Sequence, residues 1–452
     1  MTRVLMLSWE YPPVLVGGLG RHVHALATTL AATGHEVTVV TRHAPGAPLQ
    51  EYAEGVRILR TPDDPVTFGT DTDNLVPWTM AFNHALTRTA LRAARTGGYD
   101  VVHAHDWLVA HTAVTLRDHL DVPLVATVHA TEAGRHQGWL PHEHNRTIHA
   151  VERWLAREAA RVIVCSEHMR AEVSRLLEPG AERVDVVHNG VDVLRWHARP
   201  RAVAAARQRF AGQADTPLVS FAGRLVYEKG VQHLIAALPR LRLRHPDLRL
   251  VVAGDGPYRA ELQAAAQAMG TADAVTFAGF LGGHDLTALM GASDCYVVPS
   301  IYEPFGMVAL EAAAVGTPVA VADTGGLAEI VEDGVTGVKF APGDPAALAD
   351  AVSTLLLMDR DDARTMARRA RRRVRESFGW PTIAGRTVAV YDEACAADDD
   401  AVSREAEGVL AAIEPAQVAP PAQVAPPTQI RPPAQIAPPA SQRPPSADLV
   451  PG

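Results

Sequence analysis

The stretch Pro299-Ser-Ile-Tyr-Glu-Pro-Phe-Gly-Met-Val-Ala-Leu-Glu311 decides the fold, because it contains a complete turn from a strand into a helix. Residues Cys295–Val298 before it are apolar, which predicts a short buried strand. The turn at Glu303–Gly306 is followed by an apolar run that predicts a helix. In an open α/β sheet, ligands bind at such turns, and the first N–H groups of the helix attract anions. We therefore expect Glu303 and Glu311 to lie in a ligand site.

Short β-branched runs recur through both halves of the chain and indicate strands. In the first half they are Val4–Leu7, Glu36–Val40, Val101–His103, Leu124–Val128, Arg161–Cys165 and Val184–Val187. In the second half they are Leu218–Ala222, Leu248–Ala253, Val275–Phe277, Cys295–Val298 and Pro318–Ala322. Most are separated by segments long enough for helices, which is typical of parallel strands with crossover helices. The pattern predicts an α/β fold of two doubly wound, Rossmann-like domains, residues 1–195 and 196–379.

Composition limits the class of protein. The chain has 452 residues, 47% of them apolar, which is enough for two or three cores. It shows neither a long uncharged apolar run nor the pattern of a signal peptide, so we expect a cytoplasmic protein. The three cysteines, Cys165, Cys295 and Cys395, are too scattered for a disulfide or zinc framework. A net charge of -9 argues against nucleic acid as a partner.

The last part of the sequence has a different composition. From residue 415 a proline-rich hexamer of the type Pro-Ala-Gln-Val-Ala-Pro repeats along the chain. Such density of proline prevents a packed core and favours extended polyproline segments. We predict that residues 397–452 form a disordered tail, which is suited to partners that recognise proline-rich segments.

Two glycine-rich turns precede helices and suggest a site for phosphates. Gly17-Gly18 follows the first strand, and a cationic pair, Arg224 and Lys229, follows the first strand of the second half. Glycines let a ligand approach the backbone, and cations beside a helix start favour a diphosphate. On spacing alone, a flexible turn and two solvated charges explain these residues equally well.

Polar residues also follow two strands of the first half. His103, His105, Asp106 and Trp107 end one strand, and His129 ends the next, where a cleft is expected. Asp106, Trp107 and His129 are candidates for contacts with a sugar. His103 and His105 could ligate a metal, but one core and one cleft residue is the favoured interpretation, because no third ligand is near in sequence.

A strongly basic segment, Arg364–Arg375, has the spacing of a helix. A solvated helical face is the simpler interpretation, and peripheral contact with an anionic membrane is the alternative.

Jointly these motifs resemble those of the retaining glycosyltransferases of family 4, which have the GT-B architecture of two such domains facing a cleft. The closest resemblance is to bacterial glycogen-synthase-like α-glucosyltransferases, and it covers residues 3–392. It rests on Gly17-Gly18, Arg224 with Lys229, Glu303 with Glu311, and His188–Asp192 near the domain crossover. Glycogen synthases commonly have a lysine two positions before the glycine pair, where this chain has Leu15.

For the second domain the resemblance implies a nucleotide-sugar site. Arg224 and Lys229 would neutralise the departing diphosphate, and Glu303 would accept hydrogen bonds from the donor sugar. Glu311 would accept hydrogen bonds from the ribose of the nucleotide. Backbone N–H groups would bind the sugar hydroxyls and phosphate at Phe305, Gly306, Met307 and Val308.

For the first domain the resemblance implies the acceptor side. The loop of Gly17 and Gly18 would close over the phosphates, and His129 would face the anomeric side of the donor sugar. Asp106 and Trp107 favour a glucan acceptor, since a tryptophan can stack on a sugar ring. A helix at about residues 380–396 would return to this domain from the second one.

The implied reaction is retaining transfer by front-face attack, in which the departing diphosphate takes the acceptor's proton, without a cofactor or metal. The expected substrates are ADP- or UDP-glucose and an α-glucan-type acceptor, giving α-1,4 links in glycogen or related polysaccharide, or maltose 1-phosphate. One alternative is a mannosyltransferase acting on a lipid acceptor, and another is a GT-B nucleotide-sugar epimerase or hydrolase. An Asp-x-Asp metal site at Asp71 and Asp73, or a catalytically silent binding protein, is less favoured.

Overall fold

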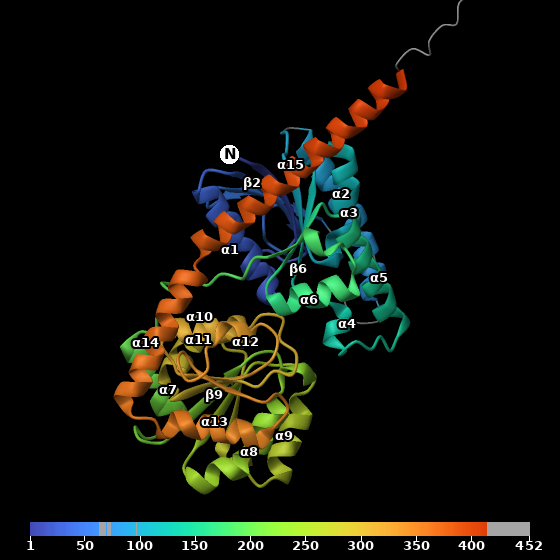
Figure 1. Cartoon of the computed structure of the whole chain (residues 1–452). Helices are drawn as coiled ribbons and strands as arrows, with labels where there is room; N and C mark the ends of the chain where they lie inside the picture. Colours follow the sequence, from blue (N-terminus) through green and yellow to red (C-terminus); the bar gives the residue numbers. More distant parts are fainter. Residues whose placement is uncertain (63–68, 70–73, 96, 414–452) are drawn as a thin grey trace, which may run out of the picture. The chain divides into compact units, whose positions relative to one another are not determined.

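The computed structural model describes residues 1–62, 69, 74–95 and 97–413, with side chains described up to residue 397. The chain divides into a unit of residues Met1–Val402, which contains all strands described, and a second unit of residues Ser403–Gly452. The first unit contains an eight-stranded and a six-stranded sheet (Figure 1). Both sheets have doubly wound orders, so the predicted fold class of two Rossmann-like domains is confirmed.

The first sheet has the order β3-β4-β2-β1-β5-β6-β7-β8, and all neighbours except β3 and β4 are parallel. Its strands are β1 (Arg3–Leu7), β2 (Glu36–Arg42), β3 (Gln50–Ala53), β4 (Val56–Thr61), β5 (Val101–His105), β6 (Leu124–Val128), β7 (Arg161–Val164) and β8 (Val184–Val186). Strands β5 and β6 are buried at every position, as expected for parallel strands covered on both faces. Sequence patterning missed β3 and β4, because β3 is a short, polar edge strand and β4 carries two arginines.

The second sheet is entirely parallel and has the order β11-β10-β9-β12-β13-β14. Its strands are β9 (Leu218–Ala222), β10 (Arg249–Ala253), β11 (Val275–Gly279), β12 (Cys295–Val298), β13 (Val319–Ala322) and β14 (Val338–Phe340). The five expected strands are all present. The sixth, β14, has only three residues, Val-Lys-Phe, and their alternation is too short to indicate a strand.

Helices connect these strands. In the first half they are α1 (Gly18–Ala32), α2 (Leu75–Ala94), α3 (Ala110–Leu120), α4 (Glu132–Arg135), α5 (Glu143–Glu158) and α6 (Glu167–Leu176). In the second half they are α7 (Pro200–Phe210), α8 (Val231–Arg244), α9 (Arg259–Ala268), α10 (Gly283–Ala292), α11 (Met307–Val315), α12 (Leu327–Ile330), α13 (Pro345–Leu357) and α14 (Arg360–Ser377). Short 3₁₀ turns are η1 (Trp107–Val109), η2 (Ala181–Arg183), η3 (Tyr227–Lys229) and η4 (Ala272–Ala274). Helix α1 buries Val23, Leu26, Ala27 and Leu30, which share one helical face.

The chain passes from the first sheet to the second and back again, and the two crossings touch. The N–H of Val191 in the first crossing donates a hydrogen bond to the carbonyl of Phe378 in the second, at 2.7 Å. Gly190 lies so close to Trp380 that an added Cβ would be 2.6 Å from its ring. The motif His188–Asp192 is therefore part of the crossover, where the sequence resemblance had located it.

Helix α15 (Trp380–Ile413) returns to the first sheet after the second crossing. Ile383, Tyr391 and Ala394 are buried in the same apolar cluster as Val4 and Met6 of β1. The Tyr391 hydroxyl also lies 2.7 Å from His103 Nδ1. The predicted return of this helix is thus explained by burial of its apolar face.

Helix α15 ends at Ile413, so its last turns overlap the start of the predicted tail of residues 397–452. The disorder of that tail stays a prediction. Residues 397–413 contain five alanines, the residue with the highest helix propensity, and they precede the proline repeats. The repeats from residue 415, like Asp71 and Asp73, lie outside the described residues. Among the helices described, none is both long and apolar enough to cross a membrane.

Two truncations test the structural role of α15. A protein ending at Ala397 keeps Ile383, Tyr391 and Ala394 and should retain the wild-type kcat/KM and Tm. A protein ending at Ser377 loses all three buried side chains and should be inactive, because deletion of large buried groups typically costs about 2–5 kcal/mol each. Activity assays and thermal melts of both proteins check this. A large loss in the longer protein would show that residues beyond 397 take part in folding or binding.

Candidate active site

A cleft of about 2230 Å³ is lined by loops at the carboxyl ends of strands from both sheets. The structure brings all the sequence-predicted site residues to this cleft. They are Gly17, Gly18, Asp106, Trp107, His129, Arg224, Lys229, Glu303, Phe305, Gly306, Met307, Val308 and Glu311. Their proximity is a finding, whereas the role of each remains a prediction.

Glu303 is held by a lysine from the neighbouring loop. Its Oε2 accepts a hydrogen bond from Lys229 Nζ at 2.8 Å and another from Ser300 Oγ at 3.0 Å. The two loops meet at Gly230, which has φ of +70° and whose added Cβ would be 1.8 Å from the carbonyl oxygen of Pro299. Only glycine fits this close approach. The pairing of Lys229 with Glu303 thus depends on Gly230.

The start of α11 is shaped in the same way. Gly306 has φ of +110°, and an added Cβ would lie 2.4 Å from Leu327 Cδ2. The chain therefore turns sharply into α11, whose first residues, Met307 and Val308, line the cleft. The first N–H groups of a helix have no partner within the helix and attract anions. This end of α11 can bind phosphate or sugar hydroxyls.

Glu311 is buried in α11 and bonded to the first domain. It is 1% exposed, and its Oε1 accepts a hydrogen bond from Arg21 Nη1 at 2.9 Å. Burial raises the pKa of Glu311 to about 7, although Arg21 opposes the shift. Glu311 Oε2 has no hydrogen-bond partner among the described residues. Sequence reasoning missed Arg21, because its partner lies 290 residues away and no local pattern marks the pair.

Arg224 is the most accessible of the predicted donor-site cations. Its side chain is 54% exposed and lies 3.9 Å from Glu228. A pair this exposed adds little to stability. The guanidinium is consequently available to an anionic ligand in the cleft.

The glycine loop of the first domain is fixed by Glu10. Its Oε2 accepts hydrogen bonds from the N–H groups of Val16 and Gly17, at 2.9 and 3.0 Å. Added Cβ atoms at Gly17 and Gly18 would meet nothing within 4 Å, so the loop borders open space. Sequence reasoning left a flexible turn open at this position and did not identify Glu10.

Asp106 supports His129. Its Oδ1 accepts a hydrogen bond from the His129 N–H at 2.8 Å, and burial raises the pKa of Asp106 to about 7. Asp106 also has a positive φ of 62°, which is unusual for a residue other than glycine. One of its two oxygens is thus used to fix the end of β6. Trp107, in η1, is partly buried and lines the cleft beside it.

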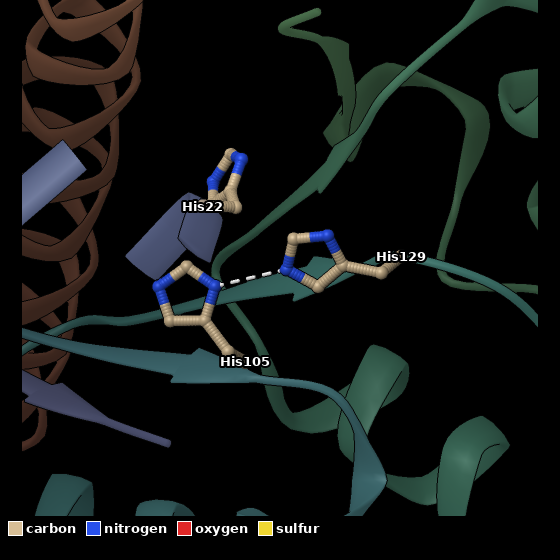
Figure 2. A group of neighbouring side chains, drawn as sticks. All are labelled: His22, His105 and His129. Carbon is tan, nitrogen blue, oxygen red and sulfur yellow. Dashed lines mark hydrogen bonds between the residues drawn. The ribbon is translucent and has the colours of Figure 1, made fainter. Parts of the chain in front are cut away.

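Three histidines gather next to Asp106, from α1 and from the ends of β5 and β6 (Figure 2). They are His22, His105 and His129, and His105 Nδ1 lies 3.1 Å from His129 Nε2. His103 is not part of this group, because its two nitrogens are bonded to Tyr391 and Thr127. The expectation of one core and one cleft residue at positions 103 and 105 was wrong, since both side chains are completely buried.

The basic helix α14 faces the cleft. Arg368, Arg371, Arg372 and Arg375 line it, and their spacing of three, four and seven residues puts them on one helical face. We call these four residues the arginine row. Among the described residues none of the four pairs with a carboxylate. Arg368 donates a hydrogen bond to Thr365 Oγ1. The sequence indicated the helix but not what its charged face meets.

The structure has two doubly wound domains, and carboxylates, cations and the start of a helix line the cleft. These features define the GT-B class of enzymes. Residues 16–195 match the family model described as Glycosyltransferase Family 4, and residues 204–373 match that of Glycosyl transferases group 1. The chain belongs to the family 4 glycosyltransferases.

Individual relatives agree with this assignment. The chain is 47% identical to a glycogen synthase of Mycobacterium tuberculosis over 402 residues, which are 86% of this chain and 94% of that protein. It is 34% identical to the alpha-maltose-1-phosphate synthase of Mycolicibacterium smegmatis, over 86% of this chain and 98% of that protein. A sucrose-phosphate synthase structure from Thermosynechococcus elongatus superposes with a TM-score of 0.76 at 28% identity, covering 88% of this chain and all of that one.

The titration of Glu311 gives a test of its environment. A carboxyl with a raised pKa stabilises the fold below its ordinary pKa of 4.5, and this contribution is lost as the pH rises through about 7. The Glu311→Gln variant lacks this loss. The Tm of the variant minus that of wild type should therefore increase from about pH 5 to about pH 8. The corresponding change in the difference of unfolding free energy is at most about 3 kcal/mol.

The Arg21→Met variant is the matched comparison. Arg21 holds the pKa of Glu311 down, so without it the loss of stability should extend to higher pH. Thermal melts of the three proteins across this range give the answer. A constant difference between wild type and Glu311→Gln would contradict the raised pKa.

Proposed function

We propose that this glycosyltransferase moves glucose from a nucleotide diphosphate glucose, ADP- or UDP-glucose, to an α-glucan-type acceptor, with retention of anomeric configuration and without a metal. The observation that carries the proposal is the cleft pairing of Lys229 with Glu303 beside the start of α11, in a chain 47% identical to a glycogen synthase. The links formed would be α-1,4.

The donor is proposed to lie along the second domain. Its diphosphate would meet the start of α11, together with Lys229 and the exposed guanidinium of Arg224. Glu303, already oriented by Lys229, would accept hydrogen bonds from the hydroxyls of the donor sugar. The unpaired Oε2 of Glu311 would accept one from the ribose, which satisfies a buried acceptor.

Charge stabilisation is the proposed source of the rate enhancement. As the bond to the anomeric carbon breaks, negative charge develops on the diphosphate, where Arg224, Lys229 and the N–H groups of α11 are positioned in advance. The acceptor hydroxyl would attack from the same face and give its proton to the departing diphosphate. His129, fixed by Asp106, would border the anomeric carbon. A metal ion is not needed where these groups supply the positive charge.

The assay that tests this proposal measures release of ADP or UDP with each nucleotide glucose and with glycogen or maltooligosaccharide as acceptor. Release should need the acceptor and should not be lost when EDTA is added. NMR of the first product should show an α-anomeric link. Strict dependence on Mg²⁺ or Mn²⁺ would instead favour a metal site at Asp71 and Asp73, and an inverted product would exclude the retaining route.

Replacement of Glu303 should nearly abolish transfer. We expect Glu303→Ala to lower kcat/KM by about 2–4 kcal/mol of transition-state stabilisation, or roughly 30- to 1000-fold, while the protein stays folded. Glu54→Ala is the matched control, because Glu54 also lines the cleft but is exposed. Wild-type kcat/KM in a folded Glu303→Ala protein would remove Glu303 from the donor site.

A second candidate function is favoured by the arginine row. Four guanidinium groups that have no carboxylate partner in the described part of the chain line the cleft, and an uncharged glucan gives them no anion to bind. Glucose 1-phosphate as acceptor would supply one, and the product would then be maltose 1-phosphate. The 34% identity to an alpha-maltose-1-phosphate synthase supports this candidate. Contact of the same helix with an anionic membrane, and a lipid acceptor, remain weaker proposals.

The two acceptors can be separated by substitutions in α14. Loss of charge-assisted contacts in Arg371→Gln/Arg372→Gln should lower kcat/KM for glucose 1-phosphate about tenfold or more, with little effect on glycogen. Arg369→Gln is the control, since Arg369 is on the same helix but does not line the cleft. Equal losses with both acceptors would argue against a phosphate-binding role, and binding to anionic liposomes would support the membrane proposal.

We also propose that the protein is cytoplasmic and that a partner recognises its proline-rich repeats. Pull-down with the isolated repeat peptide would test for such a partner.

A further inference from the structure

The histidine cluster of His22, His105 and His129 is not accounted for by the proposed reaction, which uses His129 alone. One imidazole nitrogen from each residue lies within 4.8 Å of the other two. In Figure 2 the three rings gather around one space, although they come from a helix and two strand ends. The side chains of His22 and His105 are buried, and His22 and His129 line the cleft.

Some ring nitrogens of this cluster form no hydrogen bond with the described residues. A neutral imidazole has one N–H donor and one lone pair. His22 Nδ1 and His105 Nε2 are buried without a hydrogen-bond partner among the described residues. The neighbouring His103 is different, because both of its nitrogens are bonded at 2.7 Å. The cluster thus contains ring nitrogens that the fold itself does not satisfy, which is uncommon in a buried site.

The surroundings of the three histidines favour the neutral form of each imidazole, which has one nitrogen lone pair available. Burial is the main cause that lowers the pKa of all three histidines, to about 4 for His129. Positive charge on neighbouring histidines would lower the pKa of His22 and His105 further, and the hydrogen bond of Asn189 to His22 only partly opposes this. Neutral imidazole is the form that binds metal ions.

We propose that His22, His105 and His129 form a site for a divalent transition-metal ion, represented by Zn²⁺, and that an ion bound there blocks the donor-sugar end of the cleft. The blocking rests on the proposed function, because it requires His129 to face the donor. Three nitrogen ligands without a carboxylate suit zinc, copper or nickel and not magnesium or calcium. The fourth position would open to the cleft, as in zinc sites with three protein ligands.

The geometry needs little rearrangement. Zinc–nitrogen bonds of about 2.0–2.1 Å in a tetrahedron place nitrogens about 3.4 Å apart. His105 Nδ1 and His129 Nε2 are already 3.1 Å apart, so bonds from both to one ion would replace the hydrogen bond between them, and His105 Nε2 would not be a ligand. The third nitrogen lies within 4.8 Å of both, so a shift of about 1 Å, within reach of a side-chain rotation, completes the site.

The test uses the full chain, stripped with EDTA and then titrated with Zn²⁺ or Co²⁺. We expect one Zn²⁺ per chain after dialysis, and a visible spectrum of four-coordinate Co²⁺. His22→Gln and His105→Gln should each weaken binding at least about tenfold. His24→Gln is the matched control, because His24 is on the same helix and lines the cleft outside the cluster.

Two further measurements guard against misfolded variants and separate the two proposals. Circular dichroism without metal checks the fold, and Zn²⁺ should raise the Tm of wild type and His24→Gln but not of His22→Gln. Wild type without bound Zn²⁺, or folded His22→Gln and His105→Gln proteins that bind it as wild type does, would overturn the site. Zn²⁺ binding through these histidines in a protein that transfers no glucose would overturn only the proposed function. Zn²⁺ bound there without inhibition of transfer would overturn the blocking.

Discussion

The donor side of the cleft depends on the contact between two backbone segments at Gly230 and Pro299. An added Cβ at Gly230 would lie 1.8 Å from the Pro299 carbonyl oxygen, so any side chain there would push the loops apart. This contact brings Lys229, at the end of η3, to within 2.8 Å of Glu303. A cation and a carboxylate are therefore oriented before any ligand arrives, and preorganisation of this kind is a large part of electrostatic catalysis. We propose that the charged residues carry out the chemistry, but it is an uncharged glycine that determines where they meet.

The local charge of the cleft differs from that of the chain. The whole protein carries a net charge of -9, yet Arg21, Arg224, Lys229 and the arginine row all face the cleft. Two of its buried carboxylates, Glu303 and Glu311, are each paired with one of these cations. Glu311 keeps an unsatisfied oxygen, which costs stability in the empty protein and which a ligand hydroxyl can satisfy. A buried acceptor that forms its hydrogen bond only with the substrate lowers the stability of the free protein and strengthens substrate binding.

The sequence predicted those parts of the fold and site that depend on local patterns. Strand runs, the glycine turns, and the strand–turn–helix of residues 295–311 all follow from residue spacing, and each is present. The missed elements, β3, β4 and β14, are short or polar. The contacts of Arg21 with Glu311 and of His22 with His105 and His129 join distant segments, which spacing cannot reveal. Likewise the spacing of α14 gives its basic face, but only the packing shows that this face meets the cleft.

The buried histidines show how one physical property can have two consequences. Burial lowers the pKa of His22, His105 and His129, so these side chains add no fixed positive charge to the cleft. In the proposed reaction the diphosphate is stabilised by arginine and lysine instead. The proposed transfer can then proceed without a metal, because its positive charge is built into the protein. Neutral imidazoles in close proximity are also the ligands that transition metals prefer. Where arginine and lysine supply the positive charge, as we propose, the neighbouring imidazoles are available to bind such an ion.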